Sequence, residues 1–281
     1  MRKDGKKSTI NEIIIKYKRT NYKTIYVEGL TDKSLIKWFL KKSEIKDIIV
    51  LEIQTVNIEK EKILELNLNL DENNRSRVIT LSFFIKKGII GVIDSDFDFL
   101  EKPNYEKPLH LLSTDYSAME NYCFNEEILE KILIGYPTKQ PINYQIFLDM
   151  IGNILVELFL IRFTKENKDK ERSYTDFNKN LSLNSQEIKF DRDKYLVKYL
   201  NNQTKLIQEF KAFIQEQKNN LSHNTDIRQI IHGHDFVTLL QFYLEIKQKD
   251  AKETFEKSLY GYLEYKILKE ENMFKKLLQL T

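Results

Sequence analysis

The stretch GIIGVIDSDFD (residues 88–98) decides the fold class, because a short apolar run ends directly in acidic residues. Bounded apolar runs of this length are typical of buried strands. A second such run, KTIYV (residues 23–27), ends in Glu28-Gly29. It precedes a helical apolar pattern over residues 32–42, for which Thr31 is the expected N-cap. Two such strands with a helix after the first predict an α/β fold with a mainly parallel sheet.

The rest of the chain divides into two halves of different character. Further strands are expected over residues 48–53 and 109–112, and helices over residues 8–17 and 59–70. Residues 71–75 read as a polar loop, while residues 77–86 fit a helix or a strand equally. From residue 143 onward the apolar spacing is helical. We therefore expect a basic N-terminal segment (1–22), an α/β domain (23–135) and an α-helical C-terminal region (136–281).

Composition excludes several classes of protein. The 281 residues include 17 Phe and 15 Tyr, too many for a disordered chain. The single cysteine, Cys123, excludes a disulfide framework and a multi-cysteine zinc site, and we expect it in the core. The chain begins without an apolar run, and charges interrupt its most apolar stretch, residues 142–163. We therefore expect a cytoplasmic protein with no signal peptide and no membrane span.

Acidic residues follow both of the predicted strands. Glu28 and Asp32 come after the first, and Asp94 and Asp96 after the second. In open α/β sheets, ligands bind at the carboxyl ends of the strands. Residues two apart in an extended segment point the same way, so Asp94 and Asp96 would share one ion. Oxygen ligands suit Mg²⁺ or Mn²⁺, and Glu28 would lie beside the metal, where a carboxylate can move a proton.

The acidic residues permit other interpretations. Most isolated Asp-x-Asp sequences are turn residues or helix caps. An EF-hand loop beginning at Asp94 would need Gly and Glu where Phe99 and Tyr105 stand. A phosphatase of the haloacid-dehalogenase type would use Asp94 as a nucleophile. The phosphatase mechanism gives the upstream Glu28 no role. The presence of acidic residues after both predicted strands therefore favours a metal site.

The joint pattern resembles the TOPRIM domain, a Rossmann-like fold shared by topoisomerases, bacterial primases and nucleases of the overcoming-lysogenization-defect (OLD) family. YVEGLTD (residues 26–32) is similar to its first motif, and IDSD (residues 93–96) to its Asp-x-Asp motif. The resemblance implies that Glu28 acts in acid/base chemistry or metal binding. It also implies that Asp94, Asp96 and Asp32 bind Mg²⁺ or Mn²⁺.

Two downstream stretches narrow the resemblance. STDYSAMENY (residues 113–122) and GHDFVTLL (residues 233–240) resemble motifs of a TOPRIM subgroup that includes the toxic subunit of the PARIS anti-phage system. The resemblance implies an endonuclease that causes abortive infection and cleaves transfer RNA rather than DNA. It also implies that a partner ABC-type ATPase releases the nuclease, and that the active form is a homodimer. Glu120 becomes a further candidate metal ligand, or equally a first-turn helix acid. His234 stands where the subgroup carries Lys, and Asp235 is expected to cap a helix.

Contacts to the substrate and two functional alternatives stay open. Lys33 and Lys37, with Lys41, lie four residues apart, so they form one helix stripe that fits phosphate contacts or a solvated face. His234 is the third candidate nucleic-acid contact. The alternatives to a transfer RNA nuclease are a DNA-cleaving OLD-like nuclease and a non-catalytic binding subunit of an ATPase complex.

Overall fold

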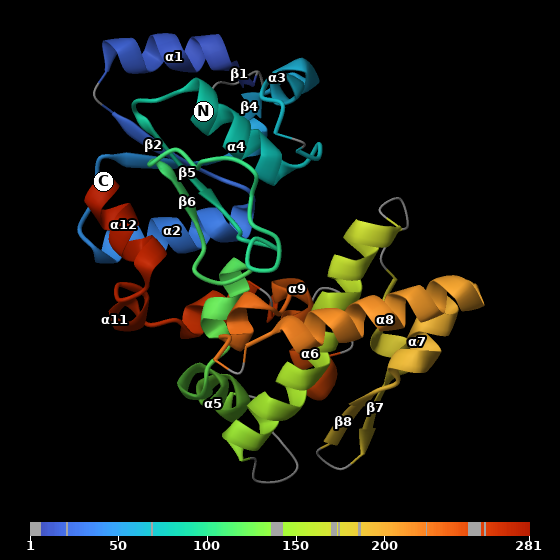
Figure 1. Cartoon of the computed structure of the whole chain (residues 1–281). Coiled ribbons are helices and arrows are strands. Elements are labelled where there is room, and N and C mark those ends of the chain that lie inside the picture. Colours follow the sequence, from blue (N-terminus) through green and yellow to red (C-terminus); the bar gives the residue numbers. More distant parts are fainter. Residues whose placement is uncertain are drawn as a thin grey trace. The chain divides into compact units, whose positions relative to one another are not determined.

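The computed structural model describes residues 7–20, 22–68, 70–135, 143–169, 173, 175–184, 187–222, 224–246, 254–255 and 257–281 (Figure 1). The chain divides into two compact units. The first unit holds residues 1–115 together with residues 264–281, and the second unit holds residues 116–263.

The first unit contains a four-stranded parallel sheet in the order β3-β2-β5-β6. The strands are β2 (Lys23–Val27), β3 (Ile48–Glu52), β5 (Ile89–Ile93) and β6 (Leu111–Ser113). β2 lies between β3 and β5, with Lys23 opposite Ile48 and Thr24 opposite Ile89. The expected α/β class is confirmed, and the two strands that carry the acidic motifs are direct neighbours.

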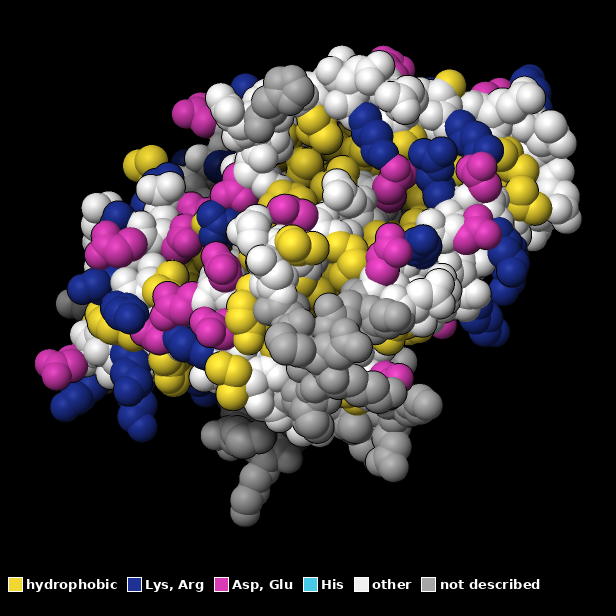
Figure 2. Space-filling view, turned by 90° about the horizontal axis from the view of Figure 1, so that it is seen from below, with side chains coloured by type: hydrophobic (Ala, Val, Ile, Leu, Met, Phe, Trp, Pro, Cys, Tyr) yellow, Lys and Arg dark blue, Asp and Glu magenta, His cyan; other side chains and the backbone are white. Residues whose placement is uncertain are grey.

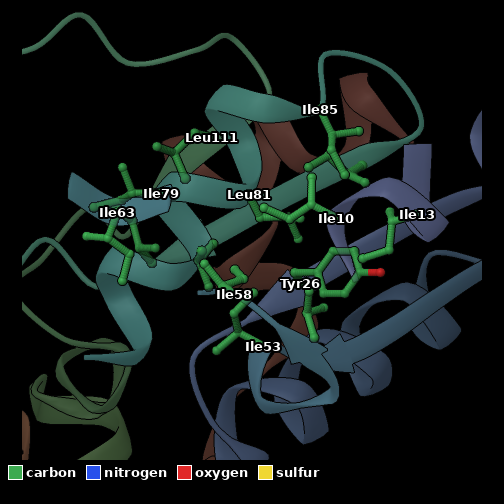
Figure 3. Packing of buried hydrophobic residues seen from close by; sticks show 14 of the residues in the cluster. Ile10, Ile13, Tyr26, Ile53, Ile58, Ile63, Ile79, Leu81, Ile85 and Leu111 are labelled. Carbon is green, nitrogen blue, oxygen red and sulfur yellow. The ribbon is translucent and has the colours of Figure 1, made fainter. Parts of the chain in front are cut away.

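Helices cover both faces of this sheet (Figure 1). The helices α1 (Ile10–Arg19), α3 (Lys60–Glu65) and α4 (Asn74–Phe84) pack on one face, where a short parallel pair joins β1 (Ser8–Thr9) to β4 (Val56–Asn57). Their apolar side chains interlock with those of the strands, as Figure 3 shows. The other face is covered by α2 (Leu30–Lys42), whose inward side chains are Leu35, Ile36, Phe39 and Leu40. Residues 7–20 are thus part of this unit and not a separate segment, because Ile10, Ile13 and Tyr17 are buried in its core.

Helix α4 approaches the centre of β5 closely, and this approach depends on a glycine. The strand is buried along its whole length, and a Cβ atom on Gly91 would lie 2.5 Å from Ser82 Oγ and 3.0 Å from Val78 Cγ1. The Asn73 side chain begins α4 by accepting a hydrogen bond from the Ser76 N–H. The helix therefore includes Arg75, which the sequence placed in a loop.

We expect Gly91→Ala to lower the free energy of unfolding by about 1–3 kcal/mol, because the added methyl group overpacks the contact between α4 and β5. Urea unfolding followed by the fluorescence of Trp38, the only tryptophan, measures the effect. Gly261→Ala is the matched control, because a Cβ there meets nothing within 4 Å. Equal stability of the two variants would contradict the close packing.

The C-terminal residues return to the first unit. The helices α11 (Tyr265–Leu268) and α12 (Asn272–Leu280) belong to it, and Phe274 packs on Phe39 with ring centroids 4.5 Å apart. Asp115 accepts a hydrogen bond from the Met273 N–H, so it holds the first turn of α12. The unit boundaries thus differ from the expected 135/136 division, because a distant apolar helix covers part of the sheet.

The second unit is mainly helical. Its described residues include the helices α5 (Glu126–Ile134), α6 (Tyr144–Lys168), α7 (Arg192–Tyr199), α8 (Thr204–Asn220) and α9 (Gly233–Tyr243). It also contains an antiparallel hairpin, β7 (Leu181–Asn184) with β8 (Glu187–Phe190), and the 3₁₀ turns η2 (Met119–Cys123), η3 (Asn178–Asn180), η4 (Ile227–Gln229) and η5 (Tyr260–Tyr262). The hairpin was not expected from the helical spacing of this region, and α7 and α8 are separate helices. The break falls at Asn201 and Asn202, which both have positive φ angles.

No helix in the described residues combines the length and the apolar character that a membrane crossing requires. The apolar stretch around residues 143–163 forms α6, and Cys123 is buried as expected.

Candidate active site

The acidic residues that follow β2 and β5 lie at the carboxyl edge of the parallel sheet. The Asp94 N–H donates a hydrogen bond to Glu28 Oε1 at 2.9 Å, so the first residue after β5 holds the side chain of the first residue after β2. Asn74 at the start of α4 holds the Glu28 backbone carbonyl at 2.9 Å. The sheet and α4 therefore fix Glu28 from two directions.

Asp32 belongs to the first turn of α2. That helix begins at Leu30 with Gly29 as its N-cap, two residues earlier than the expected cap at Thr31. The Asp32 carboxylate accepts a hydrogen bond from the Gly29 N–H at 3.0 Å. Because a negative charge in the first helical turn favours the helix dipole, Asp32 has a structural role in addition to its place beside Glu28.

Arg75 is the site residue that sequence reasoning missed. Its guanidinium donates to the Asp94 carbonyl at 3.0 Å and to the Asp98 carboxylate at 2.7 Å, and it lies 3.4 Å from Asp96 Oδ2. Lys107 also pairs with Asp98 at 2.7 Å. Asp98 is therefore a partner of two cations, and Arg75 holds the whole loop after β5. One sequence signal could have identified Arg75. Asn73 is a favourable N-cap residue, and a helix beginning after it would have included Arg75 in its first turn.

Asp96 has a φ angle of 45°, in the left-handed region. The segment from Asp94 to Asp96 is therefore not extended, and the argument that these two side chains point the same way does not hold. Non-glycine residues adopt this conformation at a cost and are found repeatedly at functional sites. The Asp96 side chain keeps 44 % of its surface exposed, so it remains open to a ligand.

Glu28 has a strongly altered acidity. Burial, followed by the negative charges of Asp96 and Asp32, raises the pKa of Glu28 to about 8, while the Asp94 N–H and the positive charge of Arg75 act in the opposite direction. Glu28 is half-buried. At neutral pH this carboxyl group therefore largely keeps its proton, and a pKa close to the ambient pH suits a group that transfers protons.

The donor set fits a hard divalent cation. Oxygen ligands in carboxylates suit Mg²⁺ and Mn²⁺. Burial raises the pKa of Glu28 most, the negative charges of Asp96 and Asp32 raise it further, and a bound cation would favour the ionised carboxylate. Among the described residues, no group of three or more His, Cys, Asp or Glu side chains is close enough to hold a metal ion. Mg²⁺ commonly takes only one or two carboxylates and completes its shell with water and substrate phosphate. Glu28 and Asp96 are the residues that would hold it.

The remaining sequence candidates lie elsewhere. Lys33 pairs with Glu52 at 2.8 Å, whereas Lys37 is exposed on α2. Glu120 belongs to the second unit, where its carboxylate lies against Gly233 at the start of α9; a Cβ on Gly233 would be 2.3 Å from Glu120 Oε2. His234 is exposed on the first turn of α9.

Asp235 is not a helix cap. The helix α9 begins at Gly233, with His232 as its N-cap. Asp235 is buried in the first turn and forms two hydrogen bonds with Arg162 of α6, both at 2.6 Å. The GHD stretch therefore ties α9 to α6 inside the second unit through this ion pair.

Comparisons with known proteins add no relative. No protein-family model matches the chain, and no curated protein matches it.

Proposed function

We propose that the first unit is a TOPRIM-type endonuclease domain that hydrolyses a phosphodiester bond with the help of Mg²⁺ or Mn²⁺. One observation carries the proposal: the two acidic motifs follow adjacent parallel strands, and the Asp94 N–H binds the Glu28 carboxylate. An isolated Asp-x-Asp turn would not bring an upstream glutamate to the same place. The pair at one sheet edge supports the TOPRIM resemblance.

The residues of this edge have distinct roles in the proposed reaction. A bound divalent ion would stabilise the negative charge that develops on the phosphodiester. Glu28, with its pKa of about 8, moves a proton at the attacking or leaving oxygen, and Asp96 would hold the ion together with it. Asp94 and Asp32 support this pair through backbone and helix contacts. Arg75 keeps the loop after β5 in place and supplies a fixed positive charge next to the site.

The substrate and biological role are part of the proposal. The motifs at residues 113–122 and 233–240 favour transfer RNA over DNA, and a cytoplasmic effector of anti-phage defence. In this proposal a partner ABC-type ATPase restrains the nuclease until infection, and the released chain acts as a homodimer. Glu120 and His234 lie in these motifs, in the second unit.

The decisive experiment is induction of the protein in cells, followed by sequencing of newly formed RNA and DNA ends. We expect wild type to produce new ends in transfer RNA and Glu28→Gln to produce roughly 100-fold fewer, because general acid/base groups typically contribute at least that much. Glu127→Gln is the control, since this exposed glutamate pairs only with Lys131 one helical turn away among the described residues.

Each other outcome has a defined meaning. Equal numbers of new ends from wild type and Glu28→Gln would overturn the proposed role of Glu28. New ends confined to DNA would favour the OLD-like alternative. If wild type is silent alone, the same variants are induced together with an ABC-type ATPase encoded beside the gene. An effect of that complex on cell growth that survives Asp94→Asn plus Asp96→Asn would favour a non-catalytic binding subunit.

A further inference from the structure

Basic residues gather at the amino edge of the parallel sheet, opposite the carboxylates. Lys23 is the first residue of β2, Lys46 precedes β3 by two residues, and Lys86 and Lys87 precede β5. The strand register places Lys23 opposite Ile48, and Thr24 opposite Ile89, so these positions are neighbours in space. A five-residue strand spans roughly 17 Å, and this distance separates the two edges.

The ends of two helices extend this basic region. Helix α1 ends at Arg19 just before β2, and α2 carries Lys37 and Lys41. We call the region the amino-edge surface and define it by these seven basic residues: Arg19, Lys23, Lys37, Lys41, Lys46, Lys86 and Lys87. Two acidic residues, Glu44 and Asp47, lie among them.

The amino-edge surface is hollowed. Two depressions, of about 740 and 780 Å³, share residues 44–48 as a common wall. Arg19 and Lys23 line the first, together with Tyr22, which is 58 % exposed, and Lys37 and Lys41 line the second. Lys46 lines both. Because Glu44 and Asp47 stand on the shared wall, each hollow is lined by three basic and two acidic side chains. The exposed Tyr22 ring lies at the side of the first hollow.

Most of the positive charges on the amino-edge surface are accessible to a ligand. Lys23 is fixed by hydrogen bonds to the Leu280 and Thr281 carbonyls. The other six basic side chains are exposed, and none of them forms an ion pair within the described part of the chain. Favourable interaction with the helix dipole accounts for Arg19 and Lys41 in the last turns of their helices. It does not account for Lys46, Lys86 or Lys87, which lie outside helices.

Charge segregation of this kind is local. Figure 2 shows Lys and Arg side chains interspersed with Asp and Glu over the face it displays. At the amino edge of the first unit's sheet, by contrast, the seven basic residues outnumber the two acidic ones, Glu44 and Asp47. The seven basic and two acidic side chains give the amino-edge surface a net positive charge, which raises the local concentration of an anionic ligand.

We propose that the amino-edge surface binds the phosphate backbone of a nucleic acid. Six exposed cations lie in or beside the two adjoining hollows and form no ion pair within the described part of the chain. This arrangement fits a chain of phosphates better than one small anion, and Tyr22 is placed to stack on a base. The choice of nucleic acid rests on the proposed function, but the binding does not require catalysis. Because the carboxylates lie at the other edge, the phosphates held here are not the one that is cleaved.

The test measures binding without cleavage. Fluorescence anisotropy of a labelled 20-nucleotide single-stranded RNA is recorded in EDTA between 50 and 200 mM salt, using the full chain. We expect Lys46→Glu plus Lys87→Glu to weaken binding at least tenfold at 50 mM salt and to reduce the slope of log K against log salt by about 1 to 2, since each lost phosphate contact removes roughly 0.7 for a single strand.

A control variant of equal charge change is available in the second unit. Lys194→Glu plus Lys205→Glu alters exposed side chains near the starts of α7 and α8, and we expect it to change affinity less than twofold. Thermal melts confirm that both double variants fold. If both double variants weakened RNA binding equally, the effect would depend only on the net charge of the protein, and the proposal would be overturned. Competition by polyglutamate as effective as by unlabelled RNA of the same charge would assign the surface to an acidic protein and also overturn it.

Binding and cleavage measurements test the amino-edge surface and the proposed nuclease separately. Binding that depends on Lys46 and Lys87 but is unchanged in Glu28→Gln supports the surface, whether or not the protein cleaves. Cleavage that depends on Glu28, with binding indifferent to the Lys46 and Lys87 changes, would leave the nuclease standing and overturn the surface.

Discussion

Asp235→Asn is expected to lower the free energy of unfolding by about 3–5 kcal/mol, because it leaves the Arg162 guanidinium without its carboxylate partner inside the second unit. The Asp235 side chain is only 2 % exposed and Arg162 is 21 % exposed. Both guanidinium contacts are short, at 2.6 Å. Removing one partner of a buried ion pair lowers the free energy of unfolding far more than replacing both partners by apolar residues does. Urea unfolding followed by far-UV circular dichroism measures the loss.

A double variant separates the ion pair from the packing around it. Arg162→Met plus Asp235→Leu fills the same space with apolar atoms and is expected to recover most of the lost stability, since a buried pair and an apolar replacement are often nearly equal. Lys205→Met, which removes an exposed pair with Glu209 at 3.9 Å, is the control and should cause no measurable change. A double variant as unstable as Asp235→Asn would show that Asp235 acts through other contacts.

The sheet of the first unit was largely predictable from sequence. Short apolar runs that end in acidic or glycine turns identified β2, β3 and β5, and their alternation with helices indicated parallel pairing. The positions of Glu28 and Asp94 at one edge followed from that pairing alone. This part of the prediction depended on local sequence patterns and on the topology that such patterns permit.

Helix α4 was not predictable from apolar periodicity, because half of its buried side chains are small and polar. Ser76, Thr80 and Ser82 are buried, and the two hydroxyl groups of Thr80 and Ser82 bond to backbone carbonyls four residues earlier. Such side chains satisfy their own polarity within the helix, and they let α4 approach Gly91. The close packing of α4 on β5 also places Arg75 beside the carboxylates. The helix and this site residue were therefore not predicted for the same physical reason.

The place of the C-terminal helices depends on long-range contacts. Met273, Phe274 and Leu277 give α12 an apolar face, which a sequence reveals. Its partners are Phe39 and the Asp115 carboxylate, which lie more than 150 residues away. Nothing local identifies which surface an amphipathic helix will cover, so the boundary of the first unit could be found only from the structure.

The stability of the first unit is expected to fall as the pH rises from about 4.5 to about 8 in the absence of metal. The pKa of Glu28 is raised to about 8 in the folded protein, first by burial and then by Asp96. Between these pH values the folded state holds a proton that the unfolded state has lost, so proton release opposes folding. The contribution of this one group approaches about 1.4 kcal/mol per pH unit, and amounts to a few kcal/mol over the window.

The isosteric variant Glu28→Gln carries no titrating group at this position, so its stability should match wild type near pH 4.5 and exceed it by a few kcal/mol at pH 8. Urea unfolding in EDTA at pH 4.5, 6.5 and 8, followed by Trp38 fluorescence, reports the first unit selectively because Trp38 lies on α2. Glu127→Gln, in the second unit, should follow the wild-type profile. Parallel profiles for Glu28→Gln and wild type would contradict the raised pKa of Glu28.

Addition of Mg²⁺ turns the same measurement into a test of metal binding. A ligand that binds only the folded state stabilises it in proportion to RT ln(1 + [L]/Kd), and a cation bound by Glu28 favours the ionised carboxylate. Millimolar Mg²⁺ should therefore stabilise wild type more at pH 8 than Glu28→Gln and should flatten the wild-type pH profile. Equal stabilisation of both proteins would place the ion away from Glu28. In that case burial, followed by the negative charges of Asp96 and Asp32, would account for the raised pKa of Glu28 without a bound ion.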